Sequence, residues 1–180
     1  TSLGEGQTLN ILSGGEVQFP FIAVDSTINV NGGRFRSSRL AGTLQLARSD
    51  LNIIAGDVFP QVSINAYDGS NINLLGGTIG TQTTLYGTST ATIDGGAMIA
   101  KGFDARQGAH IEIKSGINNV VRFFDGSTGR ITGGQLGRNV EAQVGSDLEI
   151  VGGEFLFNGA PIIGNTVTID ENTDILTGTL

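Results

Sequence analysis

The sequence predicts an all-β fold: a right-handed, single-stranded parallel β-helix of about eight rungs of about 20 residues, with a C-terminal β cap. A motif of alternating apolar and polar residues ending in Gly-Gly recurs along the chain, and its clearest copies begin at Ile28, Ile72, Ala91 and Leu148. The final glycines of successive copies, including the degenerate ones, lie 18 to 23 residues apart. The alternation has a period of two, as in strands, whose side chains point to opposite faces in turn.

Each rung, meaning one complete coil of the chain, is expected to contain three short strands with inward apolar residues. In the first strand these stand five and three positions before the last glycine, at Ile28 and Val30, Leu51 and Ile53, Ile72 and Leu74, Ala91 and Ile93, Ile111 and Ile113, and Leu148 and Ile150. Gly129 is the exception in this strand. In the second strand they stand two positions after the glycine, at Val17, Phe35, Val58, Ile79, Met98, Leu136 and Phe155. In the third strand they are Phe21, Leu44, Leu46, Val62, Ile64, Leu85, Phe103, Ala105, Phe123, Val140 and Ala142.

Glycines are expected at the corners between these strands, because glycine adopts positive φ without steric cost. The chain has 29 glycines and no collagen-like period. No helix pattern follows the Gly-Gly pairs, so they do not resemble a phosphate-binding loop. A small polar turn, such as Asp125-Gly-Ser127, closes each rung.

The repeat pattern stops after Gly153, so the chain is expected to consist of two parts. Residues 1–153 form the rungs of the parallel β-helix. Residues 154–180 break the pattern and are expected to form a C-terminal cap or a link to a following module, because a solenoid must protect its open end. The chain begins directly in repeat material at Thr1, which suggests a fragment of a longer protein.

Composition narrows the classes of function. The formal net charge is −7 and only 15% of residues are charged, so nucleic acid is not an expected partner. Without cysteine, the chain has neither disulfides nor thiolate–metal sites. Its single histidine, His110, cannot form a multi-histidine metal site, and it is expected to be a surface residue near a turn. We expect no cofactor and no membrane-spanning segment.

The outward rows carry polar ladders. Four positions before the last glycine stand Asn29, Asn52, Asn73, Thr92, Glu112, Arg130 and Glu149. Equivalent residues on stacked rungs lie about 4.8 Å apart, so amides and opposite charges at one position favour in-register parallel stacking. By the same reasoning Asp94 is expected beside Lys114. Ile54, Leu75 and Val151 also face outward, either as an apolar stripe covered by a partner chain, a loop or a neighbouring subunit, or as scattered exposed aliphatic residues.

Two groups of residues are candidates for ligand binding. Lys101, Arg106, Arg122 and Arg138 follow the glycine corner on consecutive rungs. They form either a basic strip for a carboxylated or sulfated glycan or a solvated face with ordinary ion pairs. Tyr67 and Tyr86 are expected in the same bend of neighbouring rungs, where they either hold a sugar ring by its apolar face or pack as a corner ladder. No residue stands out as catalytic, because acidic residues are dispersed and glycoside hydrolysis needs two neighbouring carboxylates.

The repeat resembles a known family. Gly76-Gly-Thr-Ile-Gly80, Lys101-Gly-Phe-Asp-Ala105, Asp125-Gly-Ser127 and Leu148-Glu-Ile-Val-Gly-Gly153 are similar to a "GGSVG…FDA…SGS…VNISGG" repeat of large secreted proteins from marine and planctomycete-type bacteria. The end of the chain, from Gly153 onward, looks like that family's terminal cap. The resemblance implies an extracellular β-helix that is often attached to other modules, some of them carbohydrate-active. It supplies no catalytic motif.

Three functions follow as hypotheses. The first is a non-catalytic secreted or cell-surface bacterial module that serves as an adhesion surface, stalk or carbohydrate-binding accessory domain. The second is a polysaccharide lyase or glycosidase that uses the basic strip, an analogy at the level of the fold. The third is a segment of an oligomeric fibre or appendage that associates through Ile54, Leu75 and Val151.

Overall fold

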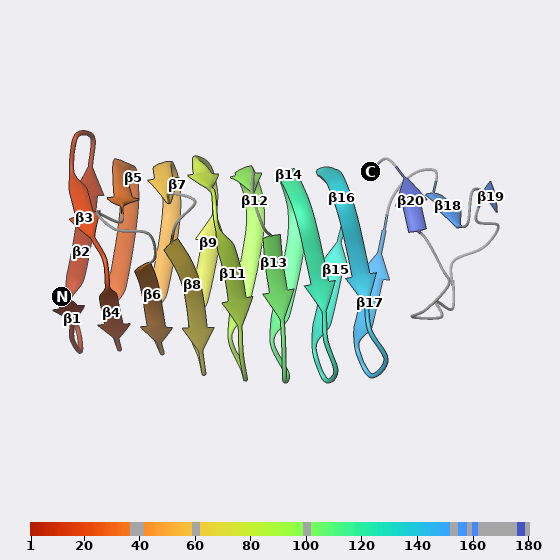
Figure 1. Ribbon diagram of the computed structural model, residues 1–180, viewed down its shortest axis with the longest axis horizontal. Coiled ribbons are helices and arrows are strands. Elements are labelled where there is room, and N and C mark those ends of the chain that lie inside the picture. The colour runs from red at the N-terminus through yellow and green to blue at the C-terminus, as the bar shows by residue number, and fades with distance from the viewer. Residues whose placement is uncertain are drawn as a thin grey trace.

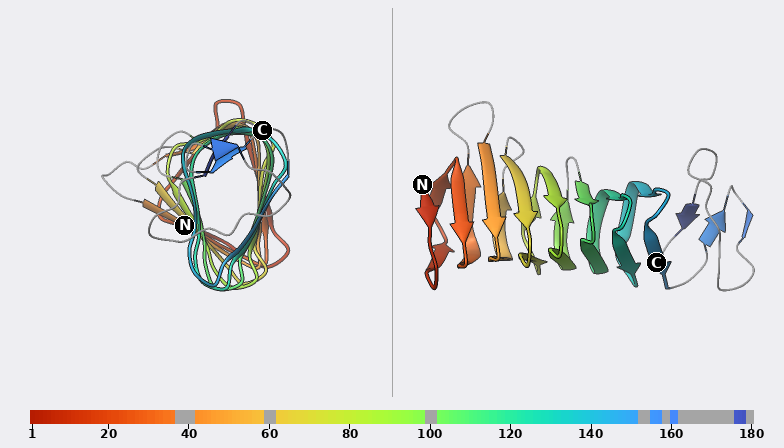
Figure 2. Two further views of the ribbon diagram at one scale, coloured as in Figure 1. Left: turned by 90° about the vertical axis from the view of Figure 1, so that its right-hand side faces the viewer. Right: turned by 90° about the horizontal axis from the view of Figure 1, so that it is seen from below.

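The computed structural model describes residues 1–36, 42–58, 62–98, 102–151, 155–157, 160–161 and 176–178. The described part of the chain contains strands and turns but no helix. Its parallel strands stack as a β-solenoid of about seven turns, which confirms the predicted fold class. Viewed along the axis the rungs superimpose as a tube, and from the side they form a row of successive layers (Figures 1 and 2).

Three strand columns form the walls of the tube. The first is made of β2 (Thr8–Leu12), β9 (Asn71–Leu74), β15 (Thr128–Ile131), β17 (Asp147–Ile150) and the first parts of β5 (Thr27–Arg36), β7 (Asp50–Val58), β12 (Thr90–Met98) and β14 (His110–Phe123). The second is made of β3 (Glu16–Gln18), β10 (Thr78–Ile79), the later parts of β5, β7 and β12, the middle of β14 and the start of β16 (Gln135–Ala142). The third is made of β1 (Ser2–Leu3), β4 (Phe21–Val24), β6 (Gly42–Ala47), β8 (Val62–Tyr67), β11 (Gln82–Leu85), β13 (Gly102–Ala105) and the ends of β14 and β16.

The predicted inward columns form the core. The register aligns Val30 with Ile53, Ile53 with Leu74, and Leu74 with Ile93, and all four side chains are fully buried. In the third column, residues aligned with Ala23 alternate between large and small: Leu46, Ala66, Leu85, Ala105 and Phe123. Stacked rungs therefore fill one tube of nearly constant width.

Gly129, the exception in the first column, has a structural explanation. It pairs with Ile111 on one side and Leu148 on the other, both of which carry a side chain at this position. A Cβ on Gly129 would overlap the ring of Phe123. The aromatic ring of the third column thus occupies the space that the first column leaves empty.

The corner glycines lie directly against the backbone of the preceding rung. Gly56, Gly77, Gly96, Gly116 and Gly134 all have positive φ. A Cβ on any of them would meet a carbonyl oxygen of a glycine one rung earlier, for example Gly33 O under Gly56 and Gly56 O under Gly77. A side chain at this corner is therefore excluded by both conformation and space.

A buried serine column lies at the turn after the third strand, a feature that the sequence pattern showed only as polar. Ser26, Ser49, Ser70, Ser89 and Ser127 are buried. The hydroxyl of Ser89 donates to Tyr86 O at 2.8 Å, and that of Ser127 donates to Phe124 O at 2.6 Å. These two hydroxyls, and that of Ser49, which donates to Ala47 O at 2.9 Å, satisfy a carbonyl of their own turn and stabilise the bend without a bulky side chain.

Asn118 departs from the apolar pattern of the core. It aligns with Met98 and Leu136 in the second column and is only 1% exposed. Its side-chain Oδ1 and Nδ2 are both buried without a hydrogen-bond partner. A buried amide without partners costs free energy, so this position is a weak point of the core.

The terminal segment differs from the rungs in strand direction. The short strands β18 (Phe155–Phe157), β19 (Ala160–Pro161) and β20 (Leu176–Gly178) pair antiparallel in a separate sheet. The cap assigned to residues 154–180 stays a prediction, because most of this segment lies outside the described residues.

Gly56→Ala and Gly14→Ala should separate the two constraints on corner glycines. Both residues have positive φ, but a Cβ on Gly14 meets nothing within 4 Å. We expect Gly14→Ala to lower the free energy of unfolding by about 1–2 kcal/mol. Gly56→Ala should lower it by more than about 3 kcal/mol, because the Gly33 carbonyl must also move. Chemical denaturation measures both values, and equal losses would contradict the stacked-carbonyl explanation.

Asn118→Leu should raise the free energy of unfolding by about 1–2 kcal/mol, because it removes the desolvation cost of an unpartnered amide. The matched control is Asn31→Leu, since Asn31 is exposed. Its effect should stay within about 0.5 kcal/mol. Denaturation curves measure both changes, and destabilisation by Asn118→Leu would show that the buried amide is satisfied in solution.

Candidate functional site

The outward side of the third column carries a row of planar side chains, here called the planar ladder: Tyr67, Tyr86, Arg106 and Phe124. The backbone places them on consecutive rungs, since Tyr86 N donates to Ala66 O at 2.9 Å, Arg106 N to Leu85 O at 3.0 Å and Phe124 N to Ala105 O at 2.9 Å. Each of these acceptors directly precedes the ladder residue of the previous rung. The ladder therefore runs along the solenoid axis.

The two tyrosines of the ladder stack on each other. Their ring centroids are 5.2 Å apart and their planes differ by 10°. Tyr67 keeps 37% of its surface exposed. The expectation that both lie in the same bend of neighbouring rungs is confirmed. Because the rings stack along the axis, each gives one face to the other.

Arg106 and Phe124 form the second half of the ladder. The guanidinium carbon of Arg106 lies 3.7 Å from the centroid of the Phe124 ring, a cation–π contact. The sequence singled out Arg106 but not Phe124. Strand alternation held the missing signal, because Phe123 points inward and the next residue must point outward.

A charge network lies beside the ladder on the same face. Asp104 is only 6% exposed and binds two arginines: its Oδ2 lies 3.4 Å from Arg106 Nη2 and its Oδ1 3.2 Å from Arg122 Nη1. Arg122 Nε also lies 3.4 Å from Glu141 Oε2. The network therefore contains two acids and two bases. Sequence patterns missed Asp104 and Glu141 because they show which residues face outward but not which of these pair.

The predicted basic strip is only partly described by the structure. Arg106 and Arg122 are brought together, but around a shared carboxylate. Lys101 lies outside the described residues, and Arg138 lies in β16 without a described side chain. The two described arginines are engaged in ion pairs, so they offer little uncompensated positive charge to an acidic glycan.

Polar ladders on the first column have the predicted form. Asn29 donates to Asn10, Asn52 to Asn29, and Asn73 to Asn52, each from Nδ2 to Oδ1 at 2.8 Å. The row then becomes charged, and Arg130 Nε lies 2.8 Å from Glu149 Oε2. In-register side chains thus satisfy one another along the axis.

The expected pairing of Asp94 with Lys114 is wrong. The register shifts after Ile93, so Asp94 aligns with Ser115, whose hydroxyl donates to Asp94 Oδ1 at 3.2 Å. Lys114 instead lies 3.1 Å from Glu112 on its own strand. A bulge at the glycine corner moves the pairing by one position.

The remaining candidates lie on other surfaces. Ile54 and Leu75 are both about half exposed and follow aligned core residues of neighbouring rungs, whereas Val151 lies several rungs away. His110 Nδ1 contacts Thr128 Oγ1 at 2.8 Å on the first column. Within the described ranges, no group of three or more His, Asp or Glu side chains is arranged to hold a metal ion.

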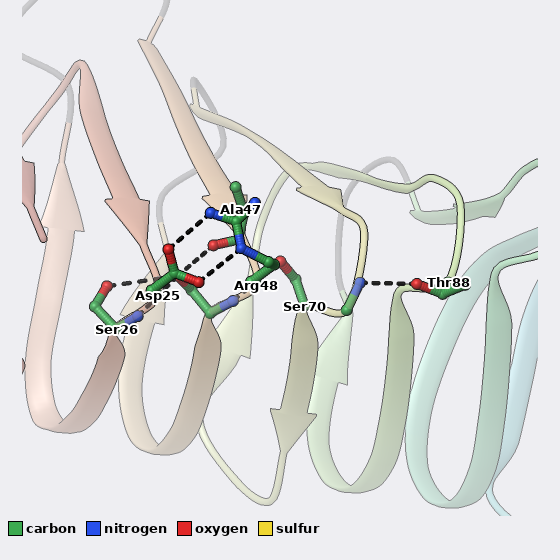
Figure 3. Close-up of polar contacts among 8 residues, drawn as sticks. Asp25, Ser26, Ala47, Arg48, Ser70 and Thr88 are labelled. Carbon is green, nitrogen blue, oxygen red and sulfur yellow. Dashed lines mark hydrogen bonds and ion pairs between the residues drawn. The ribbon is translucent and has the colours of Figure 1, made fainter. Parts of the chain in front are cut away.

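An ion pair lies at the turn next to the ladder (Figure 3). Arg48 donates from Nε to Asp25 Oδ1 and from Nη2 to Asp25 Oδ2, both at 2.7 Å. The hydrogen bonds from Arg48, aided by its charge, hold the pKa of Asp25 below its ordinary value of 3.8. Both residues have positive φ, so this pair occurs at a bend where other rungs carry glycine.

Arg48→Gln should remove a contribution to the stability of the fold that is present at neutral pH and lost in acid. Since the pKa of Asp25 is lowered in the folded state, the ion pair stabilises the fold above the ordinary value of 3.8 and is lost as pH falls through the lower folded value. We therefore expect a lower melting temperature than wild type at neutral pH and convergence of the two in strong acid. Thermal unfolding followed across pH measures this difference.

Asp25→Asn is the matched control, because it removes the titrating carboxyl group itself and asparagine tolerates positive φ. It should converge with wild type in the same acidic range. A difference between wild type and Arg48→Gln that does not change with pH would contradict a role for Asp25 ionisation.

Comparisons with protein-family models, with curated proteins and with solved structures gave no match. No helix in the described part of the chain has the length and apolar character needed to cross a membrane. The planar ladder and the charge network beside it are therefore the surface features of the third column from which a function can be inferred.

Proposed function

We propose that this chain is a non-catalytic carbohydrate-binding module of a secreted or cell-surface protein, and that the planar ladder is its binding surface. The observation that carries the proposal is the stacked pair formed by Tyr67, which is exposed, and Tyr86, which is half-buried. Aromatic side chains that are apolar in the body and polar at the tip can contact the apolar face of a sugar and hydrogen-bond its hydroxyls. The resemblance to secreted bacterial repeats agrees with this setting.

The arrangement of the ladder suits an extended chain of sugars. Rungs lie about 4.8 Å apart, so four ladder residues span about 14 Å along the axis. Asp104, Arg122 and Glu141 run parallel to the ladder and present polar groups beside it. A glycan lying along the axis would contact several rungs at once, and each weak contact would add to the affinity.

A catalytic role has less support on this face. A lyase would need a basic side chain to take a proton, and a glycosidase would need two carboxylates at a set separation. Asp104 and Glu141, two of the described acids beside the ladder, both bind arginine, and Arg106 and Arg122 bind carboxylates. We therefore propose binding without cleavage.

A stalk is the second candidate, favoured by the axial ladders. Hydrogen-bonded asparagines and alternating charges tie successive rungs together on the first column, outside the core. Such rows stiffen a solenoid along its axis, as a spacer requires. The two roles are compatible, because they use different faces of the tube.

Tyr67→Ala should weaken binding of soluble oligosaccharides by about tenfold or more, the loss expected when one stacking contact is removed. Tyr86→Ala should also weaken binding, because the Tyr67 ring then loses the ring stacked on it. A glycan array followed by calorimetry measures the effect, with product analysis to test for cleavage. Asn10→Ala on the first column is the matched control and should leave affinity unchanged. Unsaturated or shortened products would contradict the non-catalytic assignment, and equal affinities for all variants would exclude this face.

A further inference from the structure

We infer that one neutral hexopyranose ring stacks on the free face of Tyr67, over Ala47, at the N-terminal end of the planar ladder. This inference rests on the proposed function and makes it more specific. It assigns the position of the stacking contact and the charge class of the sugar.

The stacked geometry leaves few ring faces for a ligand. Tyr67 and Tyr86 face each other with centroids 5.2 Å apart and nearly parallel planes, so no sugar ring can enter between them. On the far side of Tyr86 the ladder continues with Arg106, whose guanidinium lies over Phe124. Of the faces of the two tyrosines, the face of Tyr67 that points toward the previous rung is therefore the one that a sugar can cover.

Ala47 keeps that face open. The register pairs Ala47 directly with Tyr67, one rung earlier in the same outward row. Its methyl group is too small to cover a phenol ring, whereas every later rung from Tyr86 to Phe124 places a long or planar side chain in this row. Between these two rungs the row changes from the methyl group of Ala47 to the ring of Tyr67, which leaves a gap about one rung wide, here called the step. One face of the Tyr67 ring borders the step.

Neighbouring groups favour a neutral sugar. Gln45 and Asn65 lie two residues before Ala47 and Tyr67 on the same strands, so their uncharged amides flank the step. Arg48, the cation next to it, is bound through two nitrogens to Asp25. With Arg106 and Arg122 also paired and a net charge of −7, nothing described here compensates the charge of a uronate or sulfate.

Tyr86 has a separate part in this arrangement. It covers the back of the Tyr67 ring and holds that ring nearly parallel to its own, which pre-organises the binding face. Tyr86 is thus a positioning residue, whereas Tyr67 touches the sugar.

The experiment places a larger side chain in the step. Ala47→Tyr extends the ladder by one ring and covers the free face of Tyr67. We expect it to weaken binding of neutral hexasaccharides (cellohexaose and mannohexaose) by about tenfold or more, as for loss of a stacking contact. Phe124→Ala at the other end of the ladder is the matched control, with a smaller expected effect. An oligogalacturonate of equal length should bind more weakly than the neutral chains at low salt.

The chain provides its own optical probe. It has two tyrosines and no tryptophan, and both tyrosines belong to the ladder. Tyrosine fluorescence and the tyrosine bands of the near-ultraviolet circular dichroism spectrum therefore report directly on this site in the wild-type protein. A spectral change that saturates with the same affinity as the calorimetric signal places the sugar on these rings.

The outcomes are distinguishable. Unchanged affinity in Ala47→Tyr would overturn the inference, and a loss of affinity in Phe124→Ala would then keep carbohydrate binding on this face. Tighter binding of oligogalacturonate would overturn the assignment of a neutral sugar. If the wild type bound no glycan, the proposed function would fail as well. Should Ala47→Tyr fail to fold by circular dichroism, Tyr67→Leu and Ala47→Leu provide the test, and both should weaken binding.

Discussion

The contact on which the whole structure depends is that between each corner glycine and the carbonyl of the glycine one rung before it. A side chain at Gly56 or Gly77 would force the two rungs apart at this corner. Without one, the backbone stacks directly and the strands on both sides remain at hydrogen-bonding distance. The inward columns and the outward ladders both follow from this spacing, because only rungs in register bring equivalent side chains together.

Once rungs are in register, the outside of the tube becomes a set of rows with different chemistry. Asparagines satisfy each other on the first column, arginines and carboxylates neutralise each other on the first and third, and planar groups stack at the edge of the third. The same geometry that stabilises the fold also creates long linear surfaces. A linear polymer is the ligand whose shape matches them, and for this reason the carbohydrate proposal and the architecture agree.

Much of the fold was predictable because the repeat and strand alternation determine which residues point inward. Val30, Ile53, Leu74 and Ile93 could be assigned to one buried column without coordinates. The site was less predictable. Alternation places Phe124 and Asp104 outside but does not show that one lies under a guanidinium and the other is buried between arginines. The wrong pairing of Asp94 has a related cause, since a bulge moves the register locally. Asn118 interrupts the apolar row on a single rung, and strand alternation does not show that its buried amide lacks a partner.

The Phe123–Gly129 pair has a consequence for how this protein can evolve. One rung supplies ring volume that the following rung lacks, so the two are not interchangeable units. Loss of either rung by unequal recombination would leave a hole or a collision, even though the repeat length would be preserved. Lineages that shorten or lengthen the solenoid are therefore expected to insert and delete elsewhere, and residues at these two positions should vary together.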